Sequence, residues 1–299
     1  MSSTTPDATI QALLSTAPSA EPETRADAAL RRTDWVGAAP FLAFHVLAVA
    51  YVLVAGFSLS GLGLAVALYY LRMFGVTGGY HRYFSHRSFK TSRAFQFVLA
   101  FLAMTSVQKG VLWWASHHRL HHKNSDLPGD VHSAKLDGFV WSHVGWILSR
   151  QYQETEGSRV RDLAKYPELV FLNRFHLVPP IVYGVVLYLL GGTWALGWGL
   201  LVSTVLLWHG TFTINSLSHV FGGRRYRTTD ESRNNYFLAL VTMGEGFHNN
   251  HHYYQRSANQ GFYWWEFDAT YLVLRALALV GIVWDVHRPP RHVLDANRI

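Results

Sequence analysis

The sequence predicts an all-α integral membrane protein that crosses the bilayer four times and carries its polar portion on one side. Of its 299 residues, 49 % are apolar and only 15 % are charged, against about 25 % in ordinary soluble domains. The deficit falls in two stretches, 35–71 and 175–223, which contain no Lys, Arg, Asp or Glu. A bilayer requires such stretches, because a charge at its mid-depth costs at least ~2.5 kcal/mol.

The elements follow in order along the chain. Residues 1–34 are rich in Ser, Thr, Ala, Pro and Glu without apolar periodicity, which predicts a disordered tail. Each uncharged stretch is long enough for two helices of about 18 residues. Turns are expected at Gly56–Gly61 in the first stretch and at Gly191–Thr193 in the second. The four predicted spans cover about 38–56, 61–79, 177–190 and 194–214.

The distribution of cations predicts the orientation of these spans. The two short turns contain no Lys or Arg, whereas the opposite flanks contain Arg31, Arg32, Arg72, Arg82, Arg87, Lys90, Arg174, Arg224, Arg225 and Arg227. Because Lys and Arg collect on the cytoplasmic side, both termini and the polar portion are expected in the cytoplasm. The net charge of +7 fits this bias. An anionic partner, such as lipid head groups or a phosphorylated carrier, is the alternative explanation.

Two further apolar segments are not expected to span the membrane. The run 94–108 is too short and is expected to lie in the interface or to re-enter. The segment 262–284 contains charged residues and is expected to be an interfacial or cap helix, because a fifth span would reverse the C-terminus. The chain has no cysteine, which excludes disulfides and thiolate metal sites.

Three histidine groups stand out among the 17 histidines of the chain. His81 and His86 lie five residues apart, a step that turns about 140° on an ideal α-helix, so they need a helix end or bend, or else different metals. The spacing H-x-x-H-H occurs twice, at 118–122 and at 248–252. Positions i, i+3 and i+4 share one face of a helix, so each motif is expected to direct three imidazoles to a common point.

The predicted topology gathers these groups on the cytoplasmic side. Asn215 and His219 join them, because they lie four residues apart where the fourth span leaves the membrane. Imidazole suits Zn, Cu, Fe and Ni. Eight or nine such ligands exceed the capacity of one ion and predict two metals. Neutral nitrogen ligands without thiolate or carboxylate fit a dinuclear iron centre that activates oxygen.

These motifs make the chain resemble the membrane-bound fatty acyl desaturase family, in its bacterial, acyl-CoA delta-9 (stearoyl-CoA desaturase-like) form, over residues 77–284. His81–His86, His118–His122 and Gly244–His252 match its three histidine boxes, Asn215–His219 matches an additional ligand segment, and Ser142–Trp146 is also typical. The resemblance implies a desaturase domain over 35–284, with four transmembrane helices under a cytoplasmic helical cap (81–174 and 215–284), and a tail over 285–299. The metal ligands it implies are His81, His86, His118, His121, His122, His219, His248, His251 and His252, with Asn215 acting through a water.

The resemblance also suggests supporting and substrate residues. Asp130, His132, His143 and Glu245 are expected to hold the ligand imidazoles in place. Gln108, Trp114 and Thr211 match residues that shape a bent acyl tunnel. Where animal members have Arg-Asp before the second box, this chain has Ser116-His117, and Phe212 replaces a Trp. These departures leave the acyl carrier open among CoA, a glycerolipid and a carrier protein. His45, His176, His209, His287 and His292 are expected to be structural or interfacial.

The implied reaction places a cis double bond between carbons nine and ten of a saturated acyl chain. It uses two Fe ions and O2, and Zn can replace Fe in a recombinant sample. The chain lacks haem-binding and dinucleotide-binding motifs. The electron donor is therefore expected to be a separate ferredoxin, rubredoxin or b-type cytochrome with its reductase. The partners are thus an acyl substrate, this donor and the lipid bilayer, with no nucleic acid.

Two alternatives remain. An acyl hydroxylase or related oxygenase on the same scaffold would use the same residues. A metal-binding membrane transporter is disfavoured, because most candidate ligands lie outside the predicted spans.

Overall fold

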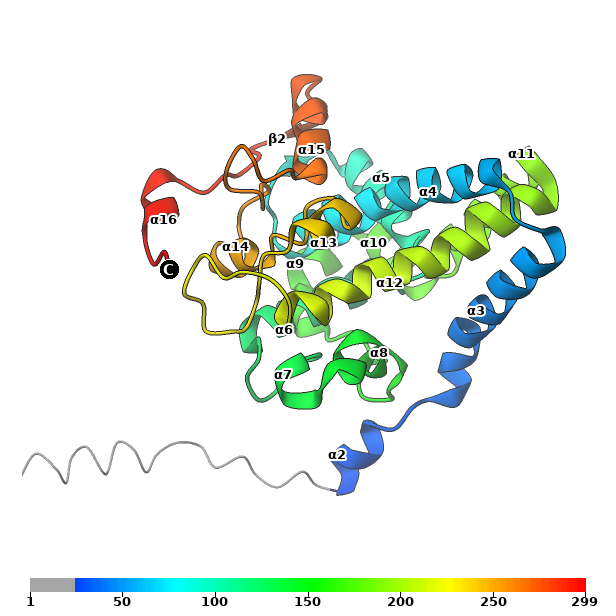
Figure 1. Cartoon of the computed structure of the whole chain (residues 1–299), viewed down its shortest axis with the longest axis horizontal. Helices are drawn as coiled ribbons and strands as arrows, with labels where there is room; N and C mark the ends of the chain where they lie inside the picture. Colours follow the sequence, from blue (N-terminus) through cyan, green and yellow to red (C-terminus); the bar gives the residue numbers. More distant parts are fainter. Residues whose placement is uncertain (1–24) are drawn as a thin grey trace, which may run out of the picture.

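The computed structural model describes residues 25–299, and that part of the chain is mostly helical (Figure 1). Long apolar helices extend to one side, and shorter helices gather at the other end (Figure 1). Most of the predicted N-terminal tail, 1–24, lies outside the described residues. Its last part contains a short helix, α2 (Arg25–Leu30), where a disordered tail was predicted.

Three helices are long and apolar enough to cross a membrane, over Trp35–Ala55, Leu59–Ser85 and Val178–His219. The first is α3 (Trp35–Ala55), which ends at Gly56 with a φ of 76°. The second begins as α4 (Leu59–Phe74), where the Ser58 side chain accepts from the N–H of Gly61. It continues as the π-helix η1 (Gly75–Ser85).

The third long helix is broken in two. It comprises α11 (Val178–Leu196), η4 (Gly197–Val202), α12 (Ser203–Asn215) and η5 (Leu217–His219). Gly191 and Gly192 have non-helical backbone angles, within the turn predicted there. The hydroxyl of Tyr183 donates to the carbonyl of Gly199 at 2.8 Å, so the two halves pack against each other. The structure therefore contains four apolar helical segments.

Two arginines counted as flanking cations are buried inside the protein. The guanidinium of Arg72 is fully buried and donates to Ser203 Oγ (2.6 Å) and Thr204 Oγ1 (2.7 Å), which joins α4 to α12. Arg82 is also fully buried. Neither side chain can meet a membrane surface, so the orientation argument rests on the other cations of that set.

The shorter elements form the other end of the molecule. They are β1 (Lys90–Thr91), α5 (Arg93–Met104), α6 (Val111–Asn124), α7 (Ala134–Asp137), η2 (Trp141–Gly145), α8 (Trp146–Leu148), η3 (Gly157–Val160), α9 (Arg161–Ala164), α10 (Pro167–Arg174), α13 (Tyr236–Val241), α14 (His248–Tyr253), α15 (Ala269–Leu279), β2 (Val283–Trp284) and α16 (Arg291–Asp295). The strands β1 and β2 pair antiparallel.

Two predicted segments are shorter than expected. The apolar run 94–108 forms the 12-residue α5. Residues 262–284 form a helix only over α15, which begins where Asp268 accepts from the N–H of Tyr271, and they end in β2. Gly75 allows η1 to pack on α5, because a Cβ there would lie 2.9 Å from the backbone N of Ala103. This contact fixes the start of η1, the helix that carries His81.

Candidate metal centre

The π-helical end of η1 directs two histidines to one point. The N–H of His86 donates to the carbonyl of His81 at 3.2 Å, which is the i to i+5 hydrogen bond of a π-helix. The wide turn brings the two ring centroids to 4.8 Å. An α-helical turn would have separated the rings by about 140°. The local backbone therefore lets both histidines serve the same site.

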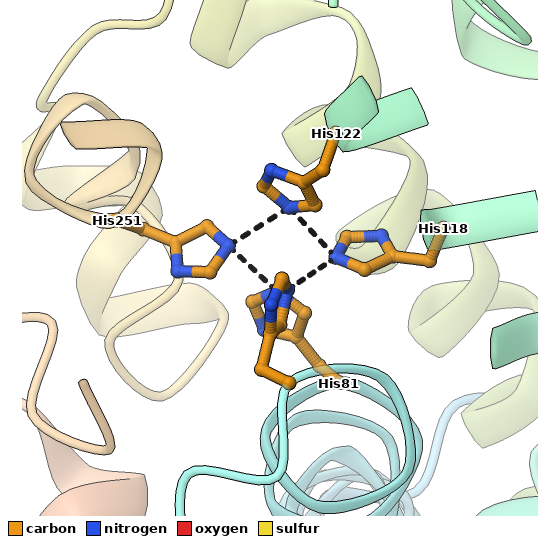
Figure 2. A group of neighbouring side chains, drawn as sticks. His81, His118, His122 and His251 are labelled. Carbon is orange, nitrogen blue, oxygen red and sulfur yellow. Dashed lines mark hydrogen bonds between the residues drawn. The ribbon is translucent and has the colours of Figure 1, made fainter. Parts of the chain in front are cut away.

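The first histidine group, called here the outer cluster, also draws rings from α6 and α14. Its members are His81, His86, His118, His122 and His251, whose ligand nitrogens lie within 4.8 Å of one another. Figure 2 shows four of these rings turning their nitrogens toward a shared centre. Three of the five side chains, those of His86, His118 and His122, are only partly buried.

The nitrogens of the outer cluster have more close nitrogen neighbours than hydrogen bonds alone can explain. The Nε2 atom of His122 lies 2.9 Å from that of His118 and 3.0 Å from that of His251. His251 Nε2 in turn lies 3.0 Å from His81 Nε2. A neutral imidazole nitrogen holds either one proton or one lone pair, so it cannot satisfy two such neighbours. Several inward lone pairs suit a bound cation.

The second group, the inner cluster, is fully buried. It comprises His121, His219, His248 and His252. The two clusters are neighbours, because the ring centroids of His122 and His252 lie 4.5 Å apart. The arrangement thus offers two adjacent sites of four or five imidazoles.

Carboxylates fix the orientation of three imidazoles of the inner cluster. The Nδ1 atoms of His121, His219 and His252 lie 2.7, 2.9 and 2.8 Å from Asp130 Oδ1, Asp126 Oδ2 and Asp230 Oδ2, respectively. An ionised carboxylate only accepts, so each Nδ1 carries the proton and each Nε2 lone pair points inward. The buried Nε2 atoms of His121 and His252 have no hydrogen-bond partner within residues 25–299. This donor set fits two metal ions of the kind that imidazole binds.

Each H-x-x-H-H motif contributes to both clusters, which corrects the expectation of three imidazoles at one point. His118 and His122 belong to the outer cluster and His121 to the inner one, while His251 is outer and its neighbours at 248 and 252 are inner. Positions i+3 and i+4 differ by about 100° around a helix. The motif can therefore straddle two ions, which ties α6 and α14 to both sites.

The pKa shifts favour the neutral form of six cluster imidazoles and the ionised form of the carboxyls beside the inner cluster. Burial, reinforced by neighbouring imidazoles, holds the pKa well below 6.5 at His86, His118, His122, His248 and His251. Burial also lowers the pKa of His252 to about 4, although Asp230 opposes it. Burial alone would raise the pKa of Asp126, Asp130 and Asp230, but their histidine partners lower it far below the usual range. At His121 the carboxylates outweigh burial and raise the pKa.

A buried ionic network supports His81 in the outer cluster. Glu245 Oε2 lies 2.6 Å from His81 Nδ1, and its Oε1 accepts from Arg82 Nη2 at 3.1 Å. Arg82 Nη1 also donates to Asp268 at 2.9 Å. Although burial raises the pKa of Glu245, His81 and Arg82 lower it overall. Glu245 therefore holds His81 as Asp130 holds its partner in the inner cluster.

Two predicted supporting histidines behave differently. His132 stacks on His121, with ring centroids 4.2 Å apart, and does not accept a hydrogen bond from it. His143 faces away from both clusters, because its Nε2 lies 3.0 Å from His209 Nδ1 and its Nδ1 lies 2.9 Å from Ser216 Oγ. His209 Nε2 in turn lies 3.0 Å from His45 Nε2. The spacing of these residues along the chain gave no sign of this imidazole chain linking α3, α12 and η2.

The predicted tunnel residues meet at a cavity that reaches the outer cluster. Gln108 Nε2 donates to Thr211 Oγ1 at 3.1 Å, and Trp114 Nε1 donates to Gln108 Oε1 at 3.4 Å. All three line a cavity of about 270 Å³, together with aromatic residues of α3, α6 and α12 and with His118.

A second cavity of about 40 Å³ shares Trp114, Thr211 and Asn215 with the first. His81, His121 and His248 line this smaller space, so it borders both clusters. Asn215 thus lies where the two cavities meet. The pair of cavities forms a largely apolar path that passes the histidines.

Several supporting residues were not found from the sequence. Asp126 lies four residues before Asp130, in the loop that follows the second histidine motif, and that proximity was the one available signal. Asp230 and Gln260 lie outside every histidine motif, and nothing in their local sequence marks them as supporting residues. Gln260 Nε2 donates to Glu245 Oε2 at 2.9 Å, a contact that only the folded chain reveals.

Comparisons with known proteins agree with this geometry. Residues 57–285 match the family model described as fatty acid desaturase. The chain is 35 % identical over 255 residues to the sn-1 stearoyl-lipid 9-desaturase of Anabaena variabilis, covering 85 % of this chain and 93 % of the relative. It is 37 % identical to acyl-CoA 5-desaturase AL21 of Anemone leveillei, over 78 % and 74 % of the two chains. It is 34 % identical to the hex-5-enoyl-[acyl-carrier protein] acetylenase of Moorena producens, over 80 % of each chain.

The matched region contains all the histidines of both clusters and the residues at the meeting of the two cavities. These relatives act on acyl groups attached to three kinds of carrier. By the family model and by its identity to these relatives, the chain belongs to the fatty acid desaturase family.

Proposed function

We propose that this protein is an oxygen-dependent desaturase that introduces a cis double bond at carbon nine of a saturated acyl chain, using two iron ions held by the outer and inner clusters. The observation that carries the proposal is that the two apolar cavities share Trp114 and Asn215 and together border both clusters, the outer one at His118 and the inner one at His121 and His248. Unactivated methylenes offer no acidic proton, so protein acids and bases alone cannot remove their hydrogens. The bound iron ions would supply the oxygen activation that this chemistry requires.

The outer cluster would hold one iron and the inner cluster the other, with Asn215 reaching the inner ion through a water. The carboxylates at positions 126, 130, 230 and 245 hold the imidazoles as Nε2 ligands, since each accepts the Nδ1 proton. Such outer contacts raise ligand basicity and fix ring orientation. Burial limits the access of water to the inner cluster, whose four imidazoles are all buried.

The hydrogen-bonded group of Gln108, Trp114 and Thr211 would bend the acyl chain where it passes the metals. A bend selects one carbon–carbon bond in an otherwise uniform chain and favours a cis product. The indole of Trp114 stacks on Tyr80 at 5.3 Å between centroids and on His118 at 4.9 Å. Trp114 is therefore held rigidly between the acyl path and a ligand.

A membrane glycerolipid is the carrier that the cavity favours. Lys109 is the single Lys or Arg among the residues that line the larger cavity. Acyl-CoA carries several phosphate charges, which call for several cations near the mouth. Ser116 and His117 supply no fixed charge there. The stearoyl-lipid desaturase among the relatives supports the same choice.

The four apolar helical segments are proposed to span the bilayer, with both termini and the cap, 81–174 and 215–284, in the cytoplasm. Two electrons per double bond would come from a separate one-electron carrier and its reductase. The N-terminal tail over 1–34, the domain over 35–284 and the tail over 285–299 remain the proposed division of the chain.

Expression in a host with a simple lipid profile, followed by gas chromatography of its fatty acids, tests the proposal. Wild type is expected to add one cis-9 unsaturated species to the membrane lipids. The variants His121→Ala and His251→Ala, one from each cluster, are expected to add none. A hydroxylated product would instead identify an acyl hydroxylase, and unsaturation that persists in both variants would contradict the proposal.

A further inference from the structure

A basic hollow, separate from the acyl cavity, opens onto the outer cluster. It has a volume of about 450 Å³ and is lined by Ser85, His86, Arg119, His122, Lys123, Gln255 and Arg256. No residue of this lining also lines the acyl cavity. The side chains of His86 and His122 form part of its wall, so a molecule seated there would lie one imidazole away from the outer site.

The helix α6 separates the two spaces. Its first half, with Trp113 and Trp114, faces the acyl cavity, and its last turns, with Arg119 and Lys123, face the hollow. In Figure 1 both α6 and α14 lie toward the end of the molecule away from α3 and α11. The hollow therefore belongs to the end of the molecule remote from α3 and α11, and its side chains Lys123 and Arg256 are exposed.

The charge of the hollow is positive, and no Asp or Glu belongs to its lining. Arg119 shares Asp162 with Arg87, at 2.7 and 2.9 Å, so these three residues together keep one positive charge. Lys123 and Arg256 are exposed and form no ion pair with a carboxylate of the described chain. Arg256 donates only to the ring of His287, at 3.3 Å.

We propose that this hollow is the docking surface for the electron donor, and that the donor is a small acidic protein that carries one electron at a time. The inference rests on the proposed function. Desaturation takes two electrons and two protons from the acyl chain, while reduction of O2 to two waters takes four of each. Two reduced carriers, each oxidised by one electron in a separate visit, supply the remaining two electrons, and solvent supplies two protons. Because the acyl cavity and the hollow are separate, the acyl chain can stay in place while one electron carrier leaves the hollow and the next one binds.

Binding can be measured without turnover. The full chain is placed in lipid nanodiscs and loaded with zinc, which has no redox chemistry. An acidic plant-type [2Fe–2S] ferredoxin is the probe, titrated at ionic strengths from about 0.02 to 1 M. Wild type is expected to bind with a Kd that weakens steeply with salt, because the Debye length falls from tens of ångströms to about 3 Å over such a range. Lys123→Glu/Arg256→Glu is expected to bind about tenfold more weakly at low salt and like wild type at about 1 M.

The matched control is Arg150→Glu/Arg291→Glu, which changes the net charge equally at exposed residues that line none of the described cavities. It is expected to bind like wild type. Any one of three results would overturn the docking proposal. They are equal weakening of binding in both double variants, unchanged binding in Lys123→Glu/Arg256→Glu, and binding by wild type that is absent or does not depend on salt.

A separate arm distinguishes this proposal from the proposed function. Iron-loaded Lys123→Glu/Arg256→Glu is reduced with dithionite, freed of excess reductant, and then given a stearoyl lipid and O2. Retained product formation shows that the acyl site is intact and that only docking has been lost. If neither wild type nor the variant forms product under chemical reduction, the proposed function fails while the binding result still decides the docking proposal.

Discussion

Replacing Glu245 by Gln keeps the shape of the side chain but removes its negative charge from the outer cluster. The carboxylate accepts from His81 Nδ1, from Arg82 and from Gln260. Without it, the Nδ1 proton of His81 loses its charged acceptor, and the Nε2 lone pair is no longer held toward the metal. Loss of such an outer contact typically weakens metal affinity ~10–100-fold, or about 1.4–2.7 kcal/mol. The inner cluster does not touch Glu245, so one metal site is expected to weaken and the other to remain.

Competition with a chelator, read by metal analysis of the purified chain, measures this effect. Glu245→Gln is expected to retain one tightly held metal where wild type retains two. Asp268→Asn is the matched control, because Asp268 pairs with the same Arg82 but does not contact His81. It is expected to lower thermal stability, since breaking a buried pair costs about 3–5 kcal/mol, yet to keep both metals. Equal metal retention by Glu245→Gln and wild type would refute the reasoning.

Three further outcomes follow from the same contacts. Arg72→Leu leaves the hydroxyls of Ser203 and Thr204 without their donor, which costs about 1–3 kcal/mol for each group left unsatisfied. The midpoint of thermal unfolding in detergent should fall by several degrees. An unchanged midpoint would contradict the role of Arg72 in joining α4 to α12. Trp114→Ala widens the bend while the ligands remain, so mass spectrometry of double-bond adducts should find a mixture of positional isomers rather than one. In the folded, metal-free chain the pKa of His252 is about 4, against an ordinary value of 6.5. Between these pH values His252 is protonated in the unfolded chain but not in the folded one, so the free energy of unfolding falls as pH is lowered. A melting temperature that is equal at pH 7 and pH 5 would count against this.

Much of the site was predictable because its signals are local. The spacing of His118, His121 and His122 pointed to imidazoles that the structure gathers into clusters, and the uncharged stretches identified the apolar helices. The glycine pair at 191 and 192 marked the break within α11. The histidine spacing and the glycine pair each lie within a few residues, where local backbone geometry decides the outcome, and the uncharged stretches are continuous runs of sequence.

What could not be predicted depends on backbone detail or on distant contacts. The π-helical turn that unites His81 and His86 differs from an α-helix by one residue per hydrogen bond, and the sequence carries no clear mark of it. The division of each H-x-x-H-H motif between two clusters depends on how α6 and α14 face each other. Asp230 reaches its histidine from 22 residues away, and buried Arg72 was read as a surface cation because it lies at a helix end.

The central claim is that histidines from separate parts of the chain hold two ions beside the acyl path. An anomalous difference map at the iron edge, from crystals of the iron-loaded chain, tests it most directly. Two peaks are predicted, one surrounded by His81, His86, His118, His122 and His251 and the other by His121, His219, His248 and His252. A single peak, or peaks away from these rings, would contradict the account.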